Sequence, residues 1–104
     1  MNIIDRLNQQ INDEKCTDQA LKQMTLTEMN LLIEKILGDL KTLAALEDKV
    51  DFDLEWEKLD TILKKMYLES SLKVTNAASK AAERKLAGEL VSKCLKATSI
   101  SSEM

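Results

Sequence analysis

The chain has 104 residues, a formal net charge of −3 and 44% apolar residues, a composition that suits one compact domain. It has no proline, only two glycines and one residue each of Phe, Trp and Tyr, which disfavours a sheet protein. Histidine is absent, so catalytic templates and metal sites that need an imidazole are excluded.

The first predicted helix is short and follows Asn2, whose side chain can cap it. Ile3, Leu7 and Ile11 align on one side of this helix at successive turns. The segment 16–18 supplies a fresh N-cap, which predicts one or two further turns before residue 25.

The clearest helical pattern covers residues 26–47. Thr25 and Glu28 have the spacing of a capping box, in which each side chain accepts a hydrogen bond from the other residue's backbone N–H. Apolar residues then recur at helical spacing: Met29, Leu32, Ile33, Ile36, Leu37, Leu40, Leu43 and Ala44. The pattern predicts a helix with one buried face.

The polar run 47–51 predicts a tight reversal, and Asp51 or Asp53 can cap the helix that follows. A second apolar stripe then steps by four, three, four and three residues: Phe52, Trp56, Leu59, Leu63 and Met66. This helix either ends near residues 70–71 or continues to about residue 96. Three acid-before-base pairs at i, i+4 favour continuity, so we expect one long helix over 53–96 with a kink at 70–76.

These elements define an all-α fold, a helical hairpin or small helical bundle with one long, kinkable C-terminal helix. Residues 1–97 form a single helical domain, and the Ser-rich tail 98–104 is expected to be disordered. No segment approaches the roughly 20 apolar residues that span a bilayer, and the first residues lack a signal-peptide pattern. A cytoplasmic protein without a membrane partner is the expectation.

No residues are predicted to be catalytic or to bind a metal, cofactor or small-molecule substrate. Cys16 and Cys94 lack a CxxC spacing and are expected to be free thiols, with a bridge between two copies as the alternative. Asp51, Asp53 and Glu55 resemble the start of a calcium loop, but the Gly and Glu that such a loop requires are missing. We therefore expect a protein that is not an enzyme.

The residual interpretation is a small adaptor, assembly subunit or chaperone-like partner that packs helix against helix, as in a coiled coil, with a second copy or another protein. The residues expected to contact that partner form one apolar seam: Met29, Leu32, Ile36, Leu40, Phe52, Trp56, Leu59, Leu63 and Met66.

Charge is uneven along the chain, with 14 acids and 7 bases in residues 1–60 against 4 acids and 8 bases in residues 61–104. Lys73, Lys80 and Arg84 lie along one side of the predicted last helix. An alternative is therefore a regulator that binds nucleic acid through these bases. A third possibility is an inhibitor that presents its acidic half to a basic protein site.

Overall fold

The computed structural model describes residues 2–46, 54–76 and 80–103, and their regular structure is entirely helical. The elements in chain order are α1 (Ile3–Ile11), the 3-10 turn η1 (Glu14–Cys16), α2 (Asp18–Gln23), α3 (Leu26–Ala44), α4 (Trp56–Asn76) and α5 (Ala81–Glu103). The prediction of an all-α fold is confirmed.

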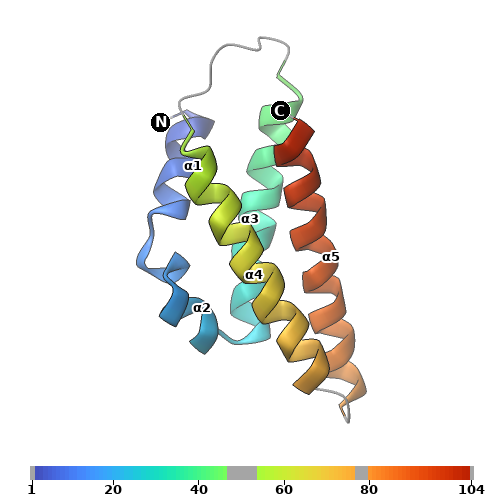
Figure 1. Ribbon diagram of the computed structural model, residues 1–104. Coiled ribbons are helices and arrows are strands. Elements are labelled where there is room, and N and C mark those ends of the chain that lie inside the picture. Colours follow the sequence, from blue (N-terminus) through green and yellow to red (C-terminus); the bar gives the residue numbers. More distant parts are fainter. Residues whose placement is uncertain (1, 47–53, 77–79, 104) are drawn as a thin grey trace.

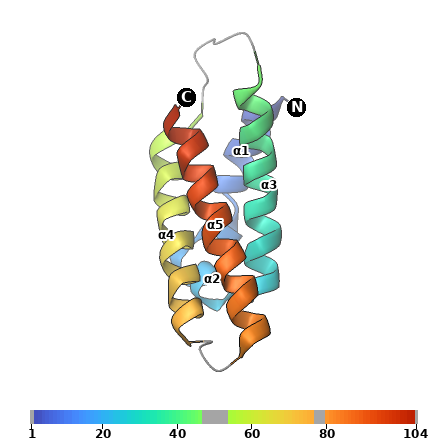
Figure 2. The ribbon, with the colours of Figure 1, turned by 90° about the vertical axis from the view of Figure 1, so that its right-hand side faces the viewer.

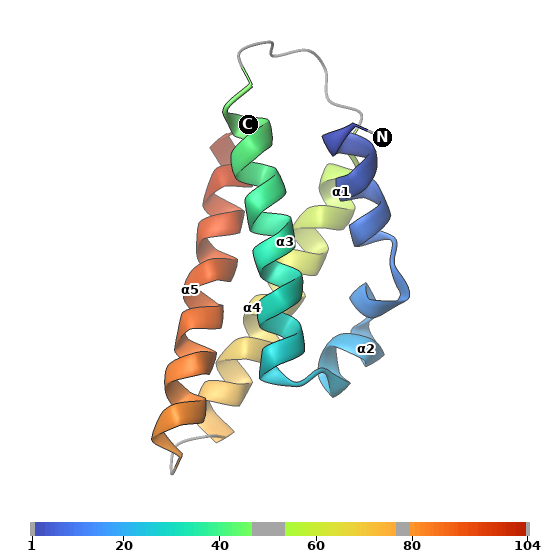
Figure 3. The same cartoon turned by 180° about the vertical axis from the view of Figure 1, so that it is seen from behind.

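Three long helices run along the 47 Å axis of the molecule (Figures 1 and 2). Helix α5 packs against both α3 and α4, and its chain direction is opposite to that of α4. Seen from behind, α1 and α2 lie on the side of α3 and α4 away from α5, in the place of a fourth helix (Figure 3). Both α3 and α5 therefore begin at the end of the bundle where α4 finishes.

The predicted helix starts are confirmed by side-chain caps. Asn2 accepts from the Asp5 N–H at 2.8 Å, and Thr17 accepts from the Ala20 N–H at 3.2 Å. At the start of α3 the Glu28 N–H donates to the Thr25 hydroxyl at 3.2 Å, and the Glu28 carboxylate accepts from the Thr25 N–H at 3.3 Å. Each cap satisfies a backbone donor that the helix leaves without a carbonyl partner.

One continuous core joins these helices. Its largest fully buried side chains come from α1, α2, α3, α4 and α5: Leu7, Ile11, Leu21, Met29, Ile33, Ile36, Leu40, Leu43, Leu59, Leu63, Met66 and Leu90. The N-terminal elements are shorter than an isolated stable helix, so their order depends on this shared burial.

The prediction of one long helix over 53–96 is wrong. Helix α4 ends at Asn76, and α5 begins at Ala81 and runs back along it. The Asp60–Lys64 pair that favoured continuity forms at 2.8 Å, but it lies inside α4 and is compatible with either arrangement. Such pairs contribute only a few tenths of a kcal/mol, whereas the reversal buries the apolar face of α5 against two helices.

The predicted disordered tail is also wrong for the residues that the structure describes. Helix α5 continues to Glu103, Ala97 is fully buried, and Ile100 packs against the core. The hydroxyl of Thr98 donates to the Cys94 carbonyl at 2.9 Å and that of Ser102 donates to the Thr98 carbonyl at 2.9 Å. These hydrogen bonds satisfy the two hydroxyl groups within the helix. The helix extends this far because the reversal places Ile100 against the core.

The predicted helix over 26–47 ends earlier, because α3 stops at Ala44. The predicted reversal at 47–51 and the caps Asp51 and Asp53 lie outside the described residues.

Candidate interaction surfaces

The apolar seam that the sequence assigned to a partner is mostly this chain's own core. Leu32 and Trp56 are partly buried and pack against that core, and Phe52 lies outside the described residues. The remaining six seam residues are 0% exposed: Met29, Ile36, Leu40, Leu59, Leu63 and Met66. In the folded chain the seam holds α3 and α4 to the other helices.

The reversal after α4 explains this correction. A single long helix would extend past its partner and leave apolar surface uncovered, but α5 instead returns to cover it. Ala87, Leu90, Cys94 and Ala97 of α5 are each 0% exposed. The surplus surface predicted for a long helix is therefore absent from the described part of the chain.

A different set of leucines faces solvent. Leu68 and Leu72 of α4 are 59% and 56% exposed, and they lie one helical turn apart on the same side. We call these two residues the α4 ridge. Leu31 of α3 and Leu95 of α5 are 56% and 53% exposed but stand on other helices. Sequence reasoning missed the ridge because neither residue belongs to the main α4 stripe.

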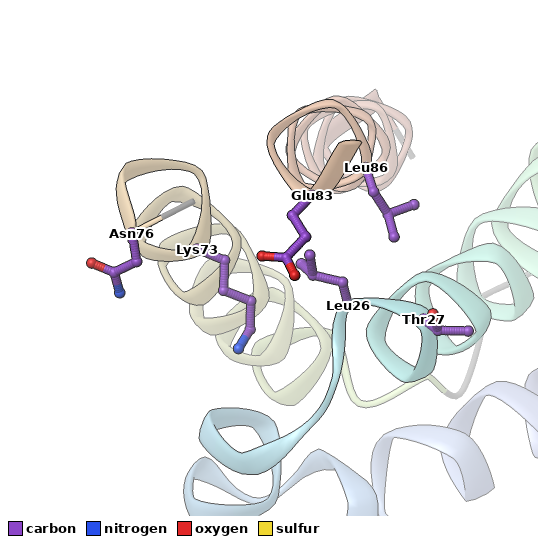
Figure 4. A pocket seen from close by; sticks show the side chains of 6 residues that line it. All are labelled: Leu26, Thr27, Lys73, Asn76, Glu83 and Leu86. Atoms are coloured by element: carbon purple, nitrogen blue, oxygen red, sulfur yellow. The ribbon is translucent and has the colours of Figure 1, made fainter. Parts of the chain in front are cut away.

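A groove of roughly 480 Å³ opens at the end of the bundle where α4 finishes and α3 and α5 begin (Figure 4). We call it the end groove. Glu83 and Leu86 reach into it from α5, while Leu26 comes from the first turn of α3. The six residues that line it are Leu26, Thr27, Lys73, Asn76, Glu83 and Leu86.

The bases of the nucleic-acid alternative are divided between the end of α4 and the beginning of α5. These three bases do not lie along one helix: Lys73 is in the last turn of α4, Lys80 immediately precedes α5, and Arg84 is in the first turn of α5. Lys80 pairs with Glu83 at 3.7 Å. Among the six lining residues Lys73 is the one base and Glu83 is the one acid, so the lining carries no net charge.

The two cysteines are buried, and both are free thiols. Burial raises the pKa of Cys16 to about 11, with the nearby Asp13 carboxylate contributing, and the Cys16 Sγ donates to the Gln10 carbonyl at 3.1 Å. Burial also raises the pKa of Cys94 to about 11, against a smaller opposing effect of Ser70. Both environments disfavour the thiolate, which is the reactive form.

Within the described ranges, no three Asp, Glu or Cys side chains are grouped so that they could hold a metal ion. None of the described helices has a stretch long and apolar enough to cross a bilayer.

No protein-family model matches the sequence, and comparisons with curated proteins and with solved structures found no significant similarity.

Proposed function

We propose that the protein is a non-enzymatic helical interaction module that binds another protein, or a second copy of itself, through the α4 ridge. The supporting observation is the exposure of Leu68 and Leu72 at 59% and 56% on successive turns of one helix. Burying a leucine side chain fully is worth about 1.5–3 kcal/mol, so covering this pair would favour association. The roles that fit are those of an adaptor, an assembly subunit or a chaperone-like partner.

The chemistry of the described residues supports a binding role. The chain has no histidine, and burial raises the pKa of both thiols to about 11. Asp39 of α3 is 8% exposed and accepts hydrogen bonds from Arg6 and Gln10 of α1. Its carboxylate therefore links α1 to α3. Exposed apolar side chains are the surface feature that remains to be explained.

Site-specific photo-crosslinking in the native host tests this proposal. A photo-reactive side chain at position 68 or 72 should yield the same crosslinked partner. Position 31 is the matched control, because Leu31 is equally exposed on another helix. A product of twice 11.7 kDa would identify a second copy as the partner. Absence of a product at positions 68 and 72, or equal yields at all three positions, would contradict the proposal.

A further inference from the structure

We infer that the partner at the α4 ridge is a second copy of this chain, and that the two α4 helices pack antiparallel about a two-fold axis. The axis passes midway between the levels of Leu68 and Leu72, so that Leu68 of one copy packs on Leu72 of the other. This inference rests on the proposed function, and it specifies which partner the ridge binds and in which orientation.

The ridge belongs to a longer exposed stripe on α4. Its residues follow one another by three or four positions, so they lie on one side of the helix. All of them are exposed, and in Figure 1 α4 crosses in front of α3 with no other described helix in front of it. A second helix can therefore lie along this side. We call these residues the outer stripe: Glu57, Thr61, Lys64, Leu68, Leu72 and Thr75.

The two leucines lie next to each other in the outer stripe, which makes the stripe self-complementary. An antiparallel pair that crosses midway between them brings all four leucines of the dimer together. Each leucine is more than half exposed in the single chain, so each has apolar surface for the other copy to cover. A two-fold axis uses the same patch on both copies, as homodimers commonly do.

Charge in the outer stripe favours antiparallel over parallel packing. In a parallel pair Glu57 and Lys64 would each face the same residue of the other copy, and like charges across an interface repel. In the antiparallel pair Lys64 instead lies beside Thr75 and Asn76 of the other copy, which are uncharged. The last carbonyl groups of α4 are at this end, and their partial negative charge favours a nearby cation.

The two ends of α4 also carry opposite charges, which antiparallel packing brings together. Glu57 in the first turn is exposed and forms no ion pair with a base among the described residues. Past the other end, Lys80 immediately precedes α5, and its pair with Glu83 is long at 3.7 Å and more than half exposed. The antiparallel dimer directs Glu57 of each copy toward Lys80 of the other. The acidic first part of the chain thus meets its basic second part.

The expected dimer is weak. Two leucines in each copy cover little area, whereas stable interfaces bury roughly 1,200–2,000 Å² in total. We therefore expect a dissociation constant in the micromolar range, with the end charges fixing the orientation of the two copies more than the affinity.

Analytical ultracentrifugation of the full chain at micromolar concentrations tests for the dimer. We expect a reversible species of twice 11.7 kDa. Leu68→Asp should weaken dimerisation about tenfold or more, because it places a carboxylate against the leucines of the other copy. Leu31→Asp is the matched control, because Leu31 is equally exposed on α3 and the substitution changes the net charge equally. Circular dichroism verifies that each variant is folded.

A charge exchange tests the orientation. Glu57→Lys and Lys80→Glu should each weaken the dimer about fivefold, because each places like charges together at both ends of the interface. The double variant exchanges the two charges and should restore the wild-type affinity. Within one chain Glu57 is about 28 Å along the axis from the end of α4 at Asn76, so restoration requires contact between copies. Glu89→Lys, at an exposed position of α5, is the control and should not rescue Lys80→Glu.

Three results would overturn the inference. They are a single 11.7 kDa species at every concentration, an equal loss in Leu31→Asp, and a double variant that dimerises no more tightly than Lys80→Glu alone. Ridge crosslinks to a protein of another mass, with this chain monomeric, would refute the second copy and leave the proposed function. A dimer that persists unchanged in Leu68→Asp, without ridge crosslinks, would refute both.

Discussion

The guanidinium group of Arg6 holds the carboxylate of Asp39 in two hydrogen bonds across the contact between α1 and α3. Nη2 lies 2.7 Å from Oδ1, and Nε lies 3.2 Å from Oδ2. Gln10 adds a third bond, from Nε2 to Oδ2 at 2.8 Å. The Asp39 side chain is 12% exposed and that of Arg6 is 56% exposed, so the carboxylate depends on these donors for its solvation.

Replacing one partner of this pair should destabilise the fold more than breaking a surface pair does. We expect Arg6→Ala to lower the free energy of unfolding by about 1–3 kcal/mol, because Asp39 then retains only the Gln10 donor. Asp60→Ala removes the exposed pair with Lys64 and should cost at most about 0.5 kcal/mol. Urea denaturation of both variants measures the difference. Equal losses would show that the Arg6–Asp39 contact contributes no more than an exposed pair.

The capping box at the start of α3 should contribute measurably to stability. Thr25→Ala removes the hydroxyl that accepts from the Glu28 N–H, and we expect a loss of about 1 kcal/mol. Thr27→Ala is the control, because Thr27 is exposed two residues further along the same helix and does not cap it. Thermal unfolding monitored by circular dichroism compares the two. A larger loss in Thr27→Ala would contradict the assignment of Thr25 as the cap.

The helix starts were predictable because their causes are local. Asn2, Thr17 and Thr25 each cap within three residues of themselves. The end of α4 was not predictable in this way. The i, i+4 ion pairs favoured a continuous helix. The free energy that favours the reversal instead comes from burying Leu90 and Ala97 against helices distant in the sequence. Periodicity identifies a buried face but does not say which element covers it.

For the candidate interaction surfaces too, the sequence pattern identified apolar faces but not the elements that cover them. The seam residues were predicted to contact a partner protein, whereas the six that are fully buried pack against helices of the same chain. Of the bases identified from sequence, Lys73 lines the end groove, and this groove depends on α5 running back along α4. Leu68 and Leu72 carried a signal that could have been used, since two leucines one turn apart lie off the main stripe.

The buried thiols should make stability fall as the pH rises above 9. In the unfolded chain a cysteine ionises near its ordinary pKa of 9.0, whereas burial holds Cys94 protonated until about pH 11. Between these values the unfolded state binds fewer protons, so ionisation favours unfolding. We expect Cys94→Ala to lose less stability than the wild type between pH 8 and about pH 10.5. Urea midpoints at both pH values test this, and parallel losses would show that the thiol does not contribute.

Small residues on α5 should be required for its close packing in the bundle. Ala87, Cys94 and Ala97 of α5 are each 0% exposed, as is Ser70 of α4, and large side chains at such positions would force helices apart. We expect Ala97→Leu to lower the free energy of unfolding by about 1–3 kcal/mol through overpacking. Ala82→Leu makes the same change at an exposed position of α5 and should be nearly neutral. Chemical denaturation of both variants distinguishes steric strain from a change in helix propensity, since propensity alone would affect the two positions similarly.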